Sequence, residues 1–282
     1  MADLTESTGS FNTQDNLKIF YRKYQADPER ARMVIAHGLG EHSGRYGNVL
    51  ERLLPKGITL WALDHRGHGQ SEGPRGHILT FNQYINDLQT MVELSKEGIP
   101  EGMKCILLGH SMGGLIALKF ALHFPEMIDG VIVSSPVLGI KVEVPIIKRA
   151  LGKVMSSIWP GMTLGNEVDA SKISHDKAVV RAYENDPLVH DRVSSRWFTE
   201  FLSAMEEVQR LCSNLKVPIL MQVAGDDDLV DADASKSFFE NLTLNDKTLY
   251  LYDGLYHEIY NEPEDERAKV LSNLETWLES HI

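Results

Sequence analysis

The chain has 282 residues, and its composition of 43% hydrophobic, 8% aromatic and 24% charged residues is typical of a soluble globular protein. A formal net charge of −12 opposes non-specific binding to nucleic acid or to an anionic bilayer, since both require a basic surface. The length suits one sheet-based core with a small insertion.

Neither the cysteines nor the N-terminus suggest export. Cys105 and Cys212 are the only cysteines, which predicts no disulfide framework. Residues 1–7 lack the basic start and the apolar segment of a signal peptide, and no apolar run is long enough to cross a bilayer. We therefore expect a cytoplasmic protein. The sequence leaves its oligomeric state open.

Strand and helix patterns alternate through the first half of the chain. The expected strands are at 17–24, 33–36, 58–63, 104–108 and 131–133, and the expected helices are near 49–54, 81–94 and 112–123. Because most of these strands lack a polar face, we expect a mostly parallel sheet with helices on both sides.

This alternation breaks down after Pro136. From residue 138 to about residue 205 the apolar spacing is helical, with Pro145, Pro160 and Pro187 as punctuation and no pattern of a central strand. We interpret residues 138–205 as an inserted helical cap.

The alternation then resumes. Strands are expected at 218–223 and 249–252, with a helix near 235–242 between them and a last helix that Pro263 can open. Residues 1–137 and 206–282 are therefore predicted to form one α/β core.

Residues 109–113, Gly-His-Ser-Met-Gly, match the G-x-S-x-G pattern of a nucleophile elbow. The segment lies between an apolar strand and a helix, which is the context that the motif requires. The alternative is a glycine-rich turn in which the serine has no catalytic role. The agreement of motif and context favours Ser111 as a nucleophile on an α/β-hydrolase fold.

A serine hydroxyl needs a base to take its proton. His257 follows the late strand across a short loop, which places it at the same end of the sheet as Ser111. The alternative is a surface histidine on an exposed turn. The common strand end favours His257 as the base.

The acid should lie between Ser111 and His257 in the chain, because this fold runs Ser, then Asp or Glu, then His. Residues 225–231 follow a strand and contain four aspartates. We choose Asp228 as the acid that orients His257, with Asp227 and Asp231 as the serious rivals.

An oxyanion hole requires two backbone N–H groups aimed at the attacked carbonyl oxygen. The N–H of Met112, directly after the nucleophile, is the first candidate. Leu39, in the glycine-containing loop after an early strand, is the second. Neither a phosphate-binding loop nor a metal-ligand spacing is present, so no cofactor is expected; the histidines near residues 65–68 are explained by a polar turn.

Three long motifs resemble those of the monoacylglycerol lipase and lysophospholipase branch of the α/β-hydrolases. Residues 37–46 resemble its oxyanion loop, residues 64–71 the turn that follows, and residues 109–114 its elbow. The likeness runs along nearly the whole chain, although the cap matches more in position than in sequence.

The resemblance implies a monoester of glycerol with a fatty acid as substrate. Its glycerol would lie near Glu41 and Arg45, which match the branch. In the animal enzymes a histidine follows the catalytic one by three residues, whereas this chain has Tyr260. The resemblance therefore does not fix the alcohol.

The cap is rich in apolar residues, some of which should face an acyl chain while others pack on the core. The candidates for the acyl site are Ile140, Val142, Ile146, Leu151, Met155, Ile158 and Trp159. Lys141, Lys148, Arg149 and Lys153 are interleaved with them, so the cap could also touch a membrane surface transiently, making the protein peripheral there.

The mechanistic hypothesis is acyl transfer. His257 deprotonates Ser111, Ser111 attacks the ester carbonyl, and water then releases the fatty acid from the acyl-enzyme. The rivals are a lysophospholipase or a broad-specificity carboxylesterase. Outside the enzyme class, the rival is a catalytically silent lipid-binding protein that retains the fold.

Overall fold

The computed structural model describes residues 6–141, 154–166 and 168–282. Its main sheet has eight strands in the order β1-β2-β4-β3-β5-β6-β9-β10. The pairs β1–β2 and β2–β4 are antiparallel and all later pairs are parallel. The strands are β1 (Glu6–Asn12), β2 (Lys18–Tyr24), β3 (Ala31–Ala36), β4 (Ile58–Leu63), β5 (Lys104–His110), β6 (Gly130–Ser134), β9 (Ile219–Ala224) and β10 (Lys247–Tyr252).

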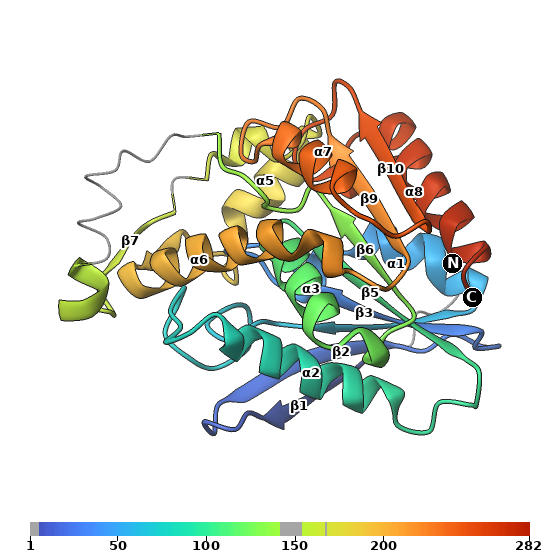
Figure 1. Cartoon of the computed structure of the whole chain (residues 1–282), viewed down its shortest axis with the longest axis horizontal. Coiled ribbons are helices and arrows are strands. Elements are labelled where there is room, and N and C mark those ends of the chain that lie inside the picture. Colours follow the sequence, from blue (N-terminus) through green and yellow to red (C-terminus); the bar gives the residue numbers. More distant parts are fainter. Residues whose placement is uncertain (1–5, 142–153, 167) are drawn as a thin grey trace.

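Helices cover both faces of this sheet (Figure 1). One face buries apolar residues of α2 and α3 against the sheet, together with residues of α6 and α7, while the other face buries residues of α1 and α8. The helices are α1 (Gly47–Leu53), α2 (Asn82–Lys96), α3 (Met112–His123), α5 (Lys177–Asn185), α6 (Ser195–Leu211), α7 (Ala232–Glu240) and α8 (Glu264–Glu279). The predicted α/β sandwich is confirmed, and β1 is a strand that the sequence patterns did not indicate.

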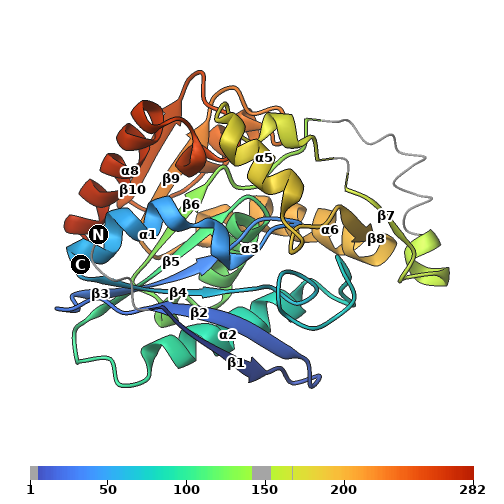
Figure 2. The same ribbon diagram turned by 180° about the vertical axis from the view of Figure 1, so that it is seen from behind.

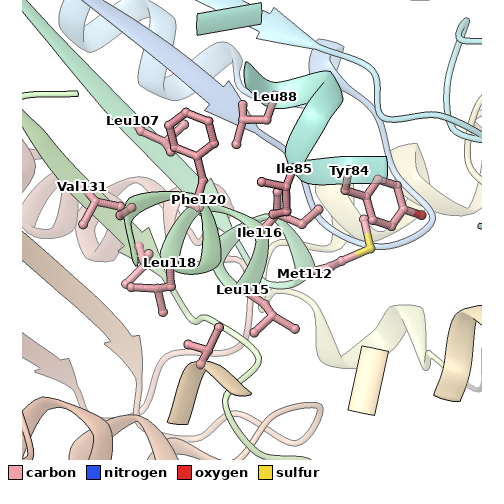
Figure 3. Packing of buried hydrophobic residues seen from close by; sticks show 14 of the residues in the cluster. Tyr84, Ile85, Leu88, Leu107, Met112, Leu115, Ile116, Leu118, Phe120 and Val131 are labelled. Carbon is pink, nitrogen blue, oxygen red and sulfur yellow. The ribbon is translucent and has the colours of Figure 1, made fainter. Parts of the chain in front are cut away.

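Helix α3 lies in the centre of the core. Its residues from Met112 to Ala121 are all buried, and all but Lys119, which pairs with Glu207, are apolar or glycine. Figure 3 shows Ile116 and Phe120 among Ile85 and Leu88 of α2 and Leu107 of β5. The element that follows Ser111 is therefore held on all sides.

The register of the parallel strands brings their ends to one edge. Ala36 of β3 pairs with Gly109 of β5, and His110 pairs with Ser134 of β6. Farther along the sheet, Ala224 at the end of β9 pairs with Tyr252 at the end of β10. The loops that follow these strands therefore meet above the same edge, where open α/β sheets bind their ligands.

Between β6 and β9 the chain leaves the sheet and forms α5, α6 and a two-stranded antiparallel sheet of β7 (Thr163–Gly165) and β8 (Arg192–Ser194). The β7–β8 pair and the start of α6 project beyond the carboxyl ends of the strands (Figure 2), whereas the rest of α6 packs on the core. Helix α6 continues past residue 205 to Leu211, with Val208 buried in the core. None of the helices in the described ranges is both long enough and apolar enough to span a bilayer.

Candidate active site

Ser111 occupies a strained turn between β5 and α3. Its φ of 54° and ψ of −117° lie in a region that a residue with a side chain rarely adopts. Backbone bonds hold it there: its N–H donates to Ser134 O over 2.9 Å, and its carbonyl accepts the N–H of Val137 over 3.2 Å. Strain of this kind costs about 1–3 kcal/mol and persists where the surroundings impose it.

The two glycines of the elbow are required by close packing. A Cβ at Gly109 would overlap the carbonyl of Gly113, and a Cβ at Gly113 would overlap the carbonyl of Ala36 at the end of β3. Only residues without a side chain permit this close approach of the backbones.

His257 is buried and paired with a carboxylate. Its Nδ1–H donates to Asp227 Oδ2 over 2.6 Å, which leaves Nε2 to accept a proton. Burial lowers the pKa of His257, but the charge and hydrogen bond of Asp227 outweigh it, with help from Glu258 and Glu41, so that the pKa lies above its ordinary value.

Asp227 is itself held in a turn. Its Oδ1 accepts the N–H groups of Leu229 and Val230 over 2.8 and 3.0 Å. Burial raises the pKa of Asp227, yet the charge and hydrogen bond of His257 and these two N–H groups bring it below its ordinary value. The carboxylate is therefore ionised beside the imidazole.

The choice of Asp228 as the orienting acid is wrong. Its side chain is 48% exposed and points away from His257, with Lys172 Nζ at 2.8 Å and Lys141 Nζ at 3.7 Å. Asp231, the other rival, accepts the N–H of Asp233 at the start of α7. Successive residues of this loop point in different directions, so spacing along the chain did not separate Asp227 from its neighbour.

The 37–41 loop, the elbow and the histidine lie together at the strand ends. A Cβ at Gly38 would lie 3.3 Å from Ser111 Cβ and 3.2 Å from His110 Cδ2. The rings of His110 and His257 have their centroids 4.9 Å apart. The predicted donors flank this point, since Leu39 follows Gly38 and Met112 opens α3, where helical N–H groups lack intrahelical partners.

Glu41 and Arg45 lie beside the site, but they are bonded to the protein. Arg45 pairs with Glu41 and with Glu258; the two glutamates are buried, and the Arg45 side chain is 10% exposed. Together with His110 and Tyr260 they line a cavity of about 10 Å³, which has room for about one water molecule. Glu258 was not singled out from the sequence; its position next to His257 was the only signal.

The hydroxyl of Tyr260 is bonded to a neighbouring strand rather than to Glu41, Arg45 or Glu258. It is fully buried, and its hydroxyl donates to Gln222 Oε1 over 2.7 Å. The amide nitrogen of the same Gln222 donates to Tyr252 Oη and to the carbonyl of Val270. Tyr260 thus belongs to a polar network that includes Gln222 of β9.

The predicted acyl-site residues fall into three groups. Ile140 forms a β-bridge with Val230 and packs on the core, and Met155 is half-buried. Ile158 and Trp159 are 75% and 65% exposed, so they line no closed pocket in this structure. Val142, Ile146 and Leu151 lie outside the described residues.

Three buried histidines, His37, His65 and His68, form a cluster next to the site. The ring centroids of His37 and His65 are 4.4 Å apart, and those of His37 and His68 are 5.4 Å apart. Burial lowers the pKa of His65 and of His68 well below the ordinary value, so these rings are neutral. In the part of the chain that the structure describes, no set of three His, Cys, Asp or Glu residues is arranged to hold a metal ion.

A sheet of this order, with a strained serine after its central strand and a buried Asp–His pair at the same edge, defines the class of α/β-hydrolase serine hydrolases. Comparison with known proteins agrees. Residues 27–264 match the family model described as "Serine aminopeptidase, S33". The chain belongs to this family.

Several proteins that match most or all of the chain are named as lipases or as a phospholipase. The chain is 32% identical over 284 residues to a monoacylglycerol lipase of Mycolicibacterium smegmatis, with 100% of both chains covered. It is 34% identical over 245 residues to the phospholipase YtpA of Bacillus subtilis, covering 86% of this chain and 93% of that one. A crystal structure of the monoacylglycerol lipase of Paleococcus ferrophilus superposes with a TM-score of 0.83 at 34% identity, covering 99% and 100% of the two chains.

Proposed function

We propose that this serine hydrolase cleaves monoacylglycerols to fatty acid and glycerol through an acyl-enzyme on Ser111. The observation that carries the proposal is the strained elbow serine at the same sheet edge as the buried Asp227–His257 pair. The substrate class is supported by the two monoacylglycerol lipases that match this chain over its whole length.

In the acylation step, Nε2 of His257 takes the proton of Ser111, and Ser111 Oγ forms a bond with the ester carbonyl carbon. The N–H groups of Leu39 and Met112 hold the negative oxygen. When the tetrahedral intermediate collapses, the carbon–oxygen bond to the alcohol breaks and the imidazolium returns its proton to glycerol. Asp227 keeps the ring in the productive tautomer and stabilises its charged form.

In the deacylation step, His257 takes a proton from water, which attacks the acyl carbon. Ser111 leaves with that proton and the fatty acid is released. We place the acyl chain beneath residues 138–205 as a cap, and the glycerol on the side of Glu41 and Arg45. Because Glu41 and Arg45 are bonded to loop residues of the protein, we propose that they act on the glycerol partly by positioning those loops.

The cap also presents an apolar surface to solvent. Val154, Ile158, Trp159 and Leu164 are each more than half exposed. Contiguous exposed apolar patches mark contact with lipid or protein, and Ile158 and Trp159 are adjacent in the chain. We propose that they touch the surface of a lipid aggregate transiently while substrate is collected.

Phospholipid hydrolysis is the second candidate, favoured by the similarity to the Bacillus phospholipase. Initial rates on monoacylglycerols of increasing acyl length, lysophosphatidylcholine and short p-nitrophenyl esters separate the two. Under the proposal, medium or long monoacylglycerols are preferred, and Ser111→Ala lowers turnover by about 10³-fold or more with the fold intact. Activity confined to short esters would discard the lipase reaction, and an active Ser111→Ala protein would overturn the nucleophile.

A further inference from the structure

We propose that Glu258 and Arg45 are positioning residues, whose buried ion pair ties the loop that carries His257 to the loop that carries the oxyanion donor. The inference rests on the proposed function, because it concerns the same reaction. Nothing in the family resemblance assigns a role to Glu258.

The ion pair is two-pronged. Arg45 Nη1 donates to Glu258 Oε1 over 2.6 Å, and Nη2 donates to Glu258 Oε2 over 2.8 Å. Such a fork fixes the relative orientation of two groups as well as their distance. Glu258 is the neighbour of His257 in the chain, so the pair restrains the backbone on which the base is mounted.

The same guanidinium reaches the other loop through Glu41. Arg45 Nη1 donates to Glu41 Oε2 over 2.8 Å, and Glu41 Oε1 accepts the N–H of Gly38 over 2.6 Å. Gly38 packs against Ser111 and precedes Leu39. A continuous path of buried polar contacts thus joins the base to the proposed oxyanion hole.

Each end of this path has a second anchor. Glu258 Oε2 also accepts from Asn261 Nδ2 over 2.9 Å, and Glu41 Oε1 also accepts from Tyr46 Oη over 2.9 Å. The segment between β6 and β9 contributes as well: the Tyr183 ring lies 4.7 Å from the Arg45 guanidinium, and Ile173 O accepts the N–H of Glu258 over 2.8 Å. Movement of any one member would therefore disturb both loops.

Stability alone is a poor explanation for this cluster. Two carboxylates and one guanidinium are taken out of water, and the desolvation of buried ions commonly offsets the attraction between them. Registry between elements is a better attested use of buried ionic groups. The Glu41–Arg45–Glu258 cluster lies between the two loops that must hold the transition state, so it can keep those loops in register.

The cluster also leaves one uncompensated negative charge near the base. The charged and titratable groups around His257 are Asp227, Glu258, Glu41, Arg45 and neutral His110. Glu258 and Glu41 both act to raise the pKa of His257. Removal of the Glu258 charge should therefore move the acidic limb of the kcat/KM profile to lower pH, an effect that a purely structural role would not produce.

Three variants separate geometry from charge. Glu258→Gln keeps the shape and removes the charge; we expect kcat for p-nitrophenyl butyrate to fall about 10- to 100-fold with little change in KM, and the acidic limb to move down. Glu258→Asp keeps the charge but is too short for both prongs, so kcat should fall while the limb stays. Glu258→Ala should lose both properties.

Glu29→Gln is the matched control. Glu29 forms a similar two-pronged pair with Arg32, at 2.9 and 3.1 Å, but at the amino end of β3, away from the site. We expect this variant to lower the melting temperature and to leave kcat and the pH profile within about twofold of the parent. All measurements are made well below each melting temperature.

The rate of fluorophosphonate labelling of Ser111 serves as a readout that needs no lipid. If the parent labels rapidly but cleaves no monoacylglycerol, the proposed substrate fails and the positioning role is judged from the labelling rates. Folded Glu258→Gln and Glu258→Asp proteins with parental labelling rates, kcat and acidic limb would overturn the inference. A parent that does not label would overturn both proposals.

Discussion

The imidazole of His257 donates from Nδ1 to Oδ2 of Asp227 over 2.6 Å, and the other oxygen of that carboxylate accepts two backbone N–H groups. Two backbone N–H groups therefore fix the orientation of the Asp227 carboxylate that bonds to His257. Neighbouring Asp228 instead faces two lysines at the surface. This difference allows a clean comparison of adjacent residues.

Asp227→Asn should lower kcat about 10³- to 10⁴-fold, because the amide no longer stabilises the imidazolium and favours the wrong tautomer. Asp228→Asn should stay within about twofold, since an exposed ion pair contributes little. Initial rates on p-nitrophenyl butyrate test both variants side by side. The reverse ranking would show that this loop rearranges when substrate binds.

The elbow strain predicts a stability difference between two inactive variants. At a φ of 54° a Cβ is disfavoured, so Ser111→Gly should relieve strain that Ser111→Ala retains. We expect the glycine variant to be more stable than the alanine variant by about 1 kcal/mol in urea denaturation. Equal stabilities would mean that the surrounding hydrogen bonds, rather than the Cβ, set the energy of the turn.

Stability should fall in mild acid because of the buried histidines. Desolvation lowers the pKa of His110 to about 4, from an ordinary value of 6.5. Below pH 6.5, His110 binds a proton in the unfolded chain but stays neutral in the folded chain. At pH 5 this difference lowers the free energy of unfolding by about 2 kcal/mol for this residue. His65 and His68 act in the same sense, whereas His257, whose pKa is raised, acts in the opposite sense.

Urea denaturation at pH 7 and pH 5 measures this loss. His65→Phe removes one of the titrating rings, and neither nitrogen of His65 has a hydrogen-bond partner within the described residues. The variant should therefore show a shallower dependence of unfolding free energy on pH. An unfolding free energy that is the same at pH 7 and pH 5 would contradict the neutral state of the cluster.

Because the apolar residues Ile158 and Trp159 of the cap are exposed, we expect their substitution to weaken binding to lipid vesicles without lowering the rate of ester hydrolysis. The double variant Ile158→Ser, Trp159→Ser should weaken association with neutral phospholipid vesicles by about tenfold or more, since burial of a large apolar side chain contributes about 1.5–3 kcal/mol. Its kcat for a soluble short ester should be unchanged. Leu251→Ser, at an exposed position on edge strand β10, is the control that should bind vesicles like the parent.

The sequence by itself determined the layout of the core. Apolar runs such as residues 58–63 and the helical spacing of residues 112–123 recur as β4 and α3 with the same bounds. Local patterns suffice there because strands buried on both faces and a predominantly apolar helix can bury their side chains only in the core. The nucleophile elbow could also be predicted from the sequence, because contacts between adjacent elements require glycine at positions 109 and 113.

Only the tertiary structure decided which carboxylate faces the imidazole. The aspartates of residues 226–228 follow the same strand, and their directions depend on a turn that is fixed by side-chain hydrogen bonds and by the loop after β10. The pairing of Arg45 with Glu258 joins residues 213 positions apart. Direction in an irregular loop and contact across such a separation are set by the packed fold, because no periodicity along the chain encodes them.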